Sequence, residues 1–154
     1  MTSLTADAAD AIVRAAIACG RDHDFMPLTV AVLDAGGHLV AFLREDGSGI
    51  MRPDIAIGKA WGAIGMGINS RLIRDRLADR PSFQNALSAV SGGKFVPVPG
   101  GVLIRDNEGT VIGAVGVSGD TSDRDEFCAI AGIKMAGLIA DPAEPAPDWD
   151  KSRL

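Results

Sequence analysis

The chain has 154 residues, of which 47% are hydrophobic and 23% charged, and its formal net charge is −5. These values are typical of one globular domain. An acidic chain without tyrosine and without a block of Lys and Arg lacks the basic stripe and stacking aromatics of a nucleic-acid groove, so we expect no nucleic-acid partner.

The location in the cell is predicted from three features. The first residues are polar and acidic, unlike a signal peptide. The most apolar window, Ile55–Ile68, is too short to span a bilayer and contains Lys59. Cys19 and Cys128 have no metal-site spacing and are expected to be small buried residues in a reducing compartment. We therefore expect a cytoplasmic protein with no membrane contact.

The first half of the chain predicts a helix, a β-hairpin and a second helix. Thr5 is a suitable N-cap and Gly20 a suitable helix stop. Two β-rich runs surround the turn Ala35-Gly36-Gly37, and Pro53 suits the first turn of a helix. The expected elements are helix 6–19, strands 28–34 and 39–44, and helix 54–66.

The second half predicts two short helices, a second hairpin and a last helix. Asn107-Glu108-Gly109 has the length and glycine that a hairpin turn requires. The expected elements are helices 70–78 and 82–89, strands 102–104 and 111–117, and helix 123–140. Two hairpins with separate helices predict an α+β domain with an antiparallel sheet over residues 1–140. The Pro-rich segment 141–154 is expected to be an extended arm, which Trp149 pins to a neighbour.

Three glycines, Gly58, Gly62 and Gly65, lie on one stripe of the second predicted helix. Each lowers helix propensity by about 1 kcal/mol relative to alanine, so the stripe indicates close approach of another group. That group is either the sheet or another subunit, or a flat ligand. The sequence leaves these alternatives open.

The segment 99–126 brings a strand, a glycine turn and a helix start together. Ser118-Gly119-Asp120 leads into the N-cap candidates at 121–123, and backbone N–H groups at such a junction can bind a small ligand. The acids of the first turn, including Asp125, are otherwise explained as partners of the helix dipole. Ser118 lacks the G-x-S-x-G pattern, so a serine hydrolase is not indicated.

Charged side chains flank the loop before the second helix. Arg44 and Lys59 are suited to holding a carboxylate, and Lys94 is a third cation near them in sequence. Ion pairs with Asp46 or Asp54 are the alternative. We expect Arg44, Lys59 and the segment 118–125 to meet at one rim of the sheet.

The two histidines, His23 and His38, have no partner at metal-ligand spacing, so a zinc site is not predicted. A single histidine serves as axial ligand in many haem proteins, and His38 is the candidate here. Solvation or a backbone hydrogen bond is the alternative for a histidine beside a turn.

Three segments, 30–47, 55–63 and 99–126, resemble the GlcG/HbpS family, which includes the C-terminal domain of PduO-type adenosyltransferases. The resemblance implies a profilin-like α+β fold, association into dimers or larger oligomers, and, for some members, haem binding or degradation. The residues that match the family's motifs are Arg44, Lys59, Gly100, Gly101, Gly116, Ser118, Gly119 and Asp125. The segment 49–54 and Trp61 depart from the family pattern, and the Glu-x-x-Glu iron motif of secreted members is absent from the sequence.

These observations lead to a small-ligand-binding protein that forms homo-oligomers and takes haem or another planar anionic molecule. The alternatives are an isomerase, lyase or hydrolase acting on a small acid, with Lys59, Asp54 and Asp125 as catalytic candidates, and a structural oligomer joined at the glycine stripe. His38 is the candidate metal ligand. The expected ligand-binding residues are Arg44, Asp46, Lys59, Trp61, Lys94, Gly100, Gly101, Ser118, Gly119 and Asp120.

Overall fold

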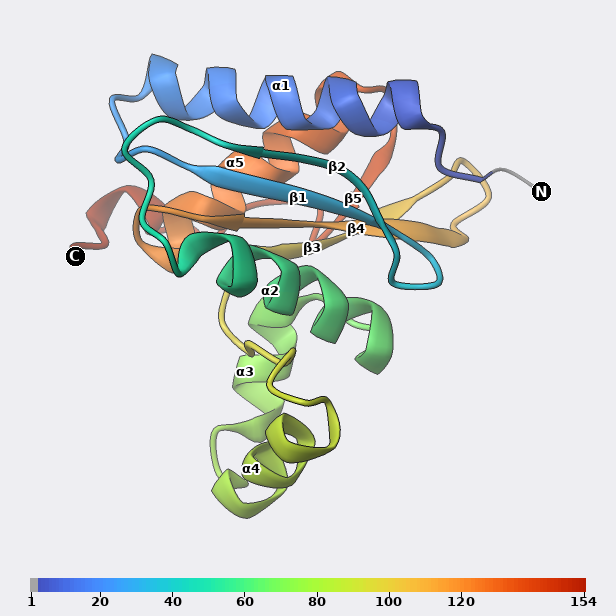
Figure 1. Cartoon of the computed structure of the whole chain (residues 1–154), viewed down its shortest axis with the longest axis vertical. Coiled ribbons are helices and arrows are strands. Elements are labelled where there is room, and N and C mark those ends of the chain that lie inside the picture. Colours follow the sequence, from blue (N-terminus) through green and yellow to red (C-terminus); the bar gives the residue numbers. More distant parts are fainter. Residues whose placement is uncertain (1–2) are drawn as a thin grey trace.

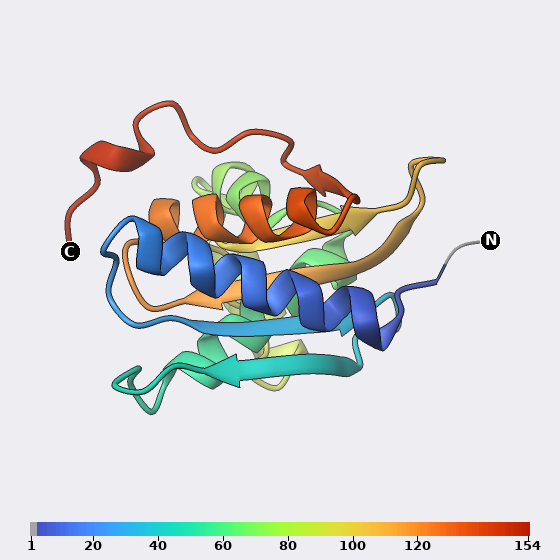
Figure 2. The same cartoon turned by 90° about the horizontal axis from the view of Figure 1, so that it is seen from above.

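The computed structural model describes residues 3–154 as one five-stranded sheet with helices on both faces (Figures 1 and 2). The elements in chain order are α1 (Ala6–Asp22), β1 (Thr29–Asp34), β2 (Leu39–Arg44), α2 (Arg52–Met66), α3 (Ser70–Leu77), α4 (Pro81–Val90), β3 (Gly101–Arg105), β4 (Val111–Ser118), α5 (Ser122–Met135), β5 (Ile139–Asp141) and the 3-10 helix η1 (Trp149–Lys151).

The sheet has the strand order β2-β1-β4-β3-β5, and every neighbouring pair is antiparallel. Both predicted hairpins are present, and β1 pairs with β4 to join them. The predicted α+β class is therefore confirmed. The arrangement predicted for the strands lacked β5, which pairs with β3 at one edge.

The helices form two layers (Figure 1). Helices α1 and α5 lie side by side on one face of the sheet, while α2 packs on the other face and carries α3 and α4 below it. The largest buried cluster lies between the sheet and the α1–α5 layer, and includes Ile12, Val30, Val115 and Ile133. The second helix is thus the element that separates the sheet from the α3–α4 part of the chain.

The capping residues predicted from the sequence agree with most helix starts, but the predicted end of the first helix does not agree with the structure. Thr5, Asn69 and Thr121 cap α1, α3 and α5 through their side chains, as such residues do. Gly20 does not end α1, which continues to Asp22, because Gly20 does not adopt the positive φ of a glycine stop; it packs against Leu28 instead.

The last helix is shorter than predicted. It ends at Met135 because Gly137 adopts a positive φ of 77°, which reverses the chain. Residues 139–141 then form β5 instead of continuing the helix.

The C-terminal segment 141–154 packs on its own chain. Asp141 pairs with Arg105 at 2.8 Å, and Trp149 stacks on Phe127 of α5 with ring centroids 3.9 Å apart. Trp149 thus holds this segment against α5 of its own chain. Among residues 3–154, no helix is both long and apolar enough to cross a membrane.

Candidate ligand-binding site

Two groups of side chains lie along α2 and contain several of the predicted site residues. We call the group at its N-terminal half, with Arg44, Arg52, Lys59, Ser118 and Asp125, the polar end. We call the hollow at its C-terminal half the apolar pocket. They differ in what their side chains contact.

The sheet register assembles the polar end from distant parts of the sequence. Thr29 of β1 pairs with Arg44 on one side and with Ser118 on the other. The Thr29 hydroxyl lies 2.7 Å from the hydroxyl of Ser48, and Arg44 Nη1 donates to the Ser48 carbonyl at 2.6 Å. Arg44 is exposed and thus available at this edge, as Asp46 is in the same loop.

Lys59 is almost fully buried, with 2% of its side chain exposed. Its ammonium donates to the Val117 carbonyl at 2.9 Å and to Asp125 Oδ2 at 3.1 Å. The other carboxylate oxygen of Asp125 accepts from the Asp120 N–H at 2.9 Å. Burial lowers the pKa of Lys59 and raises the pKa of Asp125, because removal from water disfavours both charges more than their attraction favours them.

The double glycine before β3 makes room for this lysine. Gly100 has a φ of +122°, and a Cβ there would lie 2.9 Å from Lys59 Nζ. The N–H of Gly101 donates to the Ser70 hydroxyl at 2.7 Å. These contacts explain both glycines through packing, without a ligand.

The turn after β4 is also held by internal contacts. A Cβ on Gly119 would lie 2.9 Å from Leu28 Cα, and Asp120 accepts from the N–H of Met26 at 2.8 Å. Arg52, which the sequence did not single out, donates to the Ser118 hydroxyl at 3.1 Å. The sequence could have indicated Arg52 through its position at the start of the helix that contains Lys59.

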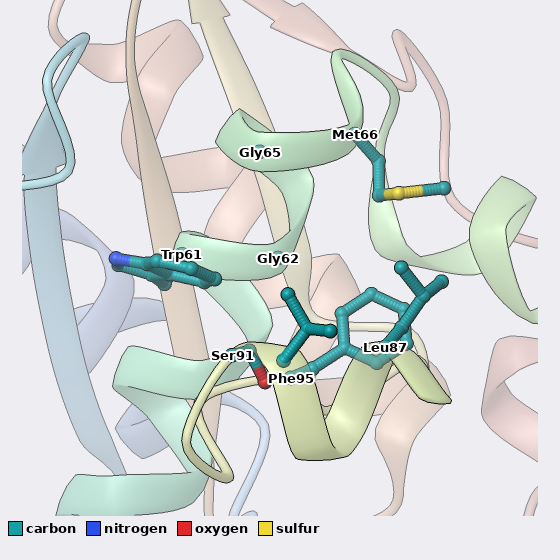
Figure 3. Close-up of a pocket in the computed structure, with 8 residues that line it drawn as sticks. Trp61, Gly62, Gly65, Met66, Leu87, Ser91 and Phe95 are labelled. Carbon is teal, nitrogen blue, oxygen red and sulfur yellow. The ribbon is translucent and has the colours of Figure 1, made fainter. Parts of the chain in front are cut away.

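The apolar pocket lies between α2, α4 and the segment that follows α4 (Figure 3). It contains about 460 Å³ of free space, part of which is open to solvent. Lys94 places its ammonium 5.8 Å from the centroid of the Trp61 indole. The lining residues are Trp61, Gly62, Gly65, Met66, Leu87, Val90, Ser91 and Phe95.

The glycine stripe is divided between packing and this pocket. A Cβ on Gly58 would lie 2.6 Å from Val96 Cγ2, and one on Gly62 would lie 3.0 Å from Phe95 Cδ1. Within the described residues 3–154, no atom approaches a Cβ on Gly65 within 4 Å. The expectation of a subunit seam at the stripe is thus corrected for Gly58 and Gly62, which receive the chain's own segment.

His38 lies at the opposite end of β2 from Arg44. Its side chain is 79% exposed, and Nδ1 lies 3.1 Å from Asp34 Oδ1. The backbone N–H of His38, with that of Gly36, helps to lower the pKa of Asp34. His38 belongs to the turn that touches Trp61 through Gly37 but does not line the apolar pocket.

Asp54, the remaining acidic candidate, lies on the surface, away from the buried pair. Asp54 is exposed and lines a separate hollow with Met51, Ile55 and Val96. In the part of the chain that is described, residues 3–154, there is no cluster of three or more His, Cys, Asp or Glu suited to a metal ion. Asp54 is therefore not part of the buried Lys59–Asp125 pair.

An α+β domain with an apolar hollow beside its central helix is the architecture of a small-molecule-binding protein. Residues 4–134 match the family described as haem degrading protein HbpS-like, and the chain belongs to this family.

Among its relatives, a Citrobacter freundii protein described as an uncharacterized 15.0 kDa protein in the dhaT-dhaS intergenic region is 32% identical over 104 residues, covering 68% of this chain and 72% of that protein. The structure of a PduOC–heme complex superposes with a TM-score of 0.80 at 24% identity, covering 89% of this chain and 97% of that one. A double mutant of Streptomyces reticuli HbpS gives a TM-score of 0.75 at 29% identity, covering 87% of both chains.

Proposed function

We propose that this protein binds a planar, largely apolar small molecule with an acidic group in the apolar pocket, and that haem is one such ligand. The observation that carries the proposal is the Trp61 indole and Gly65 at one hollow (Figure 3), with the Lys94 ammonium 5.8 Å from the centroid of that indole. Ligand pockets commonly join apolar walls to a few polar groups in this way.

Each part of the pocket matches one property of such a ligand. An indole offers a large flat face for stacking, and Gly65, whose Cβ position has no neighbour within 4 Å among the described residues, leaves the helix backbone open to the ligand. Lys94 is exposed and carries a mobile ammonium, which suits a carboxylate at the pocket's rim. The ligand would therefore lie with its apolar part inward and its acidic group at Lys94.

Haem fits this description in three respects. It needs an apolar slot, a cation for its propionates and an axial side chain. The slot and the cation are present, and the Met66 thioether in the lining is of a type that ligates haem iron. His38, the ligand expected from the sequence, would have to reach the pocket from the neighbouring turn. The family description and the haem complex of PduOC support this choice of ligand.

Titration with hemin tests the proposal. We expect a Soret band shift that saturates, a loss of affinity of about tenfold or more in Trp61→Ala, and a loss of about twofold to fivefold in Lys94→Gln. Lys151→Gln, a change of an exposed lysine at η1, is the matched control. Iron-free protoporphyrin separates stacking from axial ligation, which Met66→Leu and His38→Ala then assign. Unchanged affinity in Trp61→Ala would remove this pocket as the site.

An enzyme acting on a small carboxylic acid is the second candidate, and the buried Lys59–Asp125 pair favours it. Burial lowers the pKa of Lys59, which increases its neutral, basic form, and Arg52, whose charge acts on Lys59, contacts the Ser118 hydroxyl beside it. Arg44 lies two strands from Ser118 in the register, where its exposed guanidinium is the second group proposed to bind an acid. Isomerase, lyase and hydrolase chemistry all use such groups. A thermal-shift screen of small carboxylic acids tests it, since a substrate raises the melting temperature by mass action. Stabilisation that survives in Arg44→Gln and Arg52→Gln would count against this site.

We also propose that the protein forms homo-oligomers in the cytoplasm. The support for association is a set of exposed apolar side chains near the edge strand β2: Ile50 is 94% exposed, and Met51 and Phe42 are also exposed. Light scattering measures the mass, and Ile50→Asp with Met51→Asp should reduce it. The cytoplasmic location stays a prediction from the sequence.

A further inference from the structure

The packing of α1 against α5 brings the two cysteines together. The helices run antiparallel (Figure 2), and a Cβ on Gly132 of α5 would lie 3.2 Å from the Cβ of Ala16 on α1. One turn toward the C-terminus of α1 and the N-terminus of α5, a Cβ on Gly20 would lie 3.9 Å from the sulfur of Cys128. Cys19 is the neighbour of Gly20 in α1, and its side chain packs against the buried cluster that contains Cys128. Two thiols that are 109 positions apart in the sequence therefore share one seam.

The two thiols have different surroundings. Cys19 is partly exposed in the last turn of α1, whereas Cys128 is fully buried. His23 Nδ1 lies 2.8 Å from the Cys19 carbonyl oxygen, so it carries the proton, and the same nitrogen lies 3.9 Å from the Cys19 sulfur. Cys19 is thus the partly exposed cysteine and lies beside a ring N–H, whereas Cys128 is enclosed by the fold.

These surroundings separate the acidities of the thiols. The pKa of Cys19 is lowered to about 7, chiefly because the Cys128 thiol donates to its sulfur, with His23 adding to the effect against burial and Asp22. The contact with Cys19 and burial both raise the pKa of Cys128. At neutral pH about half of Cys19 is therefore thiolate, the form that reacts with oxidants.

We propose that Cys19 and Cys128 form a redox-responsive pair that a peroxide converts into an intramolecular disulfide. The Cys19 thiolate attacks one peroxide oxygen, the O–O bond breaks, and Cys19 becomes a sulfenic acid while hydroxide or alkoxide leaves. Cys128 then loses its proton and its sulfur attacks the Cys19 sulfur, which forms the S–S bond and releases water. The two thiols supply the two electrons that the peroxide accepts, and a low-molecular-weight thiol reverses the change.

The same seam contains an optical reporter. The His23 ring lies 5.0 Å from the Phe127 ring and 5.9 Å from the Trp149 indole, centroid to centroid, and Trp149 stacks on Phe127 beside Cys128. A disulfide at Cys128 would shift these rings. Because the chain has two tryptophans, Trp61→Phe leaves Trp149 as the single emitter.

The test treats the reduced full-length protein with a small excess of hydrogen peroxide. We expect an intact mass lower by two hydrogen atoms, loss of both free thiols, a change in Trp149 fluorescence, and recovery with dithiothreitol. Cys128→Ala should stop at a sulfenic acid that dimedone traps, and Cys19→Ser should not react at the same dose. His23→Gln should slow the reaction several-fold.

Three results would overturn the pair. These are oxygen addition without loss of the second thiol, disulfide-linked dimers in place of the intramolecular bond, and oxidation of Cys19→Ser at the parent rate. Circular dichroism checks that each variant is folded, and Cys19→Ala replaces the serine variant if it is not. Hemin binding is not involved in this readout, so the result is independent of the proposed ligand.

Discussion

The buried pair of Lys59 and Asp125 gives the sharpest test of how this fold is held together. The change is Lys59→Met, which keeps the length of the side chain but removes the ammonium. Asp125, which is 1% exposed, then keeps only the hydrogen bond from the Asp120 N–H, and the Val117 carbonyl loses its donor. A buried carboxylate without its cation is strongly destabilised.

The expected loss follows from this burial. Breaking a buried ion pair by removing one partner costs about 3–5 kcal/mol of unfolding free energy. For a chain of this length, that corresponds to a fall in Tm of roughly 6–20 °C. Asp125→Asn should cost a similar amount because it leaves the ammonium unpaired. The double variant leaves no buried charge, although the Val117 carbonyl and the side-chain amide introduced at position 125 both lose the ammonium, so its cost should be smaller than the sum of the two single costs.

Urea unfolding of the four proteins measures these values, and the slopes show whether unfolding stays two-state. Lys134→Met is the matched control, because Lys134 pairs with Glu144 at 3.1 Å on the surface and should cost less than about 1 kcal/mol. A loss of less than about 1 kcal/mol in Lys59→Met, or additive effects in the double variant, would refute the reasoning.

Three further changes probe other parts of the fold. Burial raises the pKa of Glu126 to about 7, although Arg71 Nε lies 3.2 Å away. The folded state therefore holds this proton more tightly than the unfolded chain, and stability falls as pH rises from about 4.5 to about 7. Glu126→Gln should remove that fall, so urea unfolding should show its advantage growing from pH 5 to pH 8, and a constant difference would contradict it. Trp149→Ala should lose about 2 kcal/mol with the Phe127 stack and should increase hydrogen exchange in 141–154, whereas unchanged protection would show that the arm is held elsewhere. Gly65→Ala should raise stability by up to about 1 kcal/mol, because alanine favours the helix, while weakening hemin binding through the added methyl group; unaltered hemin affinity would place the ligand away from Gly65.

The sequence predicted elements whose signals are local. A glycine turn, a capping threonine or a proline in the first helical turn acts over a few residues, which explains why both hairpins and the starts of most helices are as predicted. The strand β5 was missed because Leu138, Ile139 and Ala140 continue the apolar spacing of α5. Only the reversal at Gly137, together with pairing to β3, distinguishes a strand there.

The site depended on contacts between distant segments. That Arg44 and Ser118 lie near each other follows from the shared partner Thr29, a register that no local pattern contains. The sequence indicated Lys59 as a ligand-facing cation, but whether a lysine is exposed depends on what packs above it. Here Gly100 and Asp125 cover the ammonium. The cysteines were likewise interpreted separately, since their proximity requires the antiparallel packing of α1 and α5.

Buried ion pairs connect the two helical layers, which lie on opposite faces of the sheet. Asp125 and Glu126 follow each other on α5, so their side chains point about 100° apart around the helix. The first reaches Lys59 of α2, and the second reaches Arg71 of α3, although both of those helices lie beyond the sheet from α5 (Figure 1). The middle of α2 is thus held by the buried Lys59–Asp125 pair, while the pocket further along α2 is lined by apolar groups. Hemin binding should therefore respond to different residues from those of the buried pair: Lys59→Met should lower the unfolding free energy with little change in hemin affinity at temperatures where the variant is folded, whereas Trp61→Ala, which also removes packing against the sheet, should lower hemin affinity as well as stability. If Lys59→Met lowered hemin affinity as much as Trp61→Ala does, the buried pair and the apolar pocket would be one site.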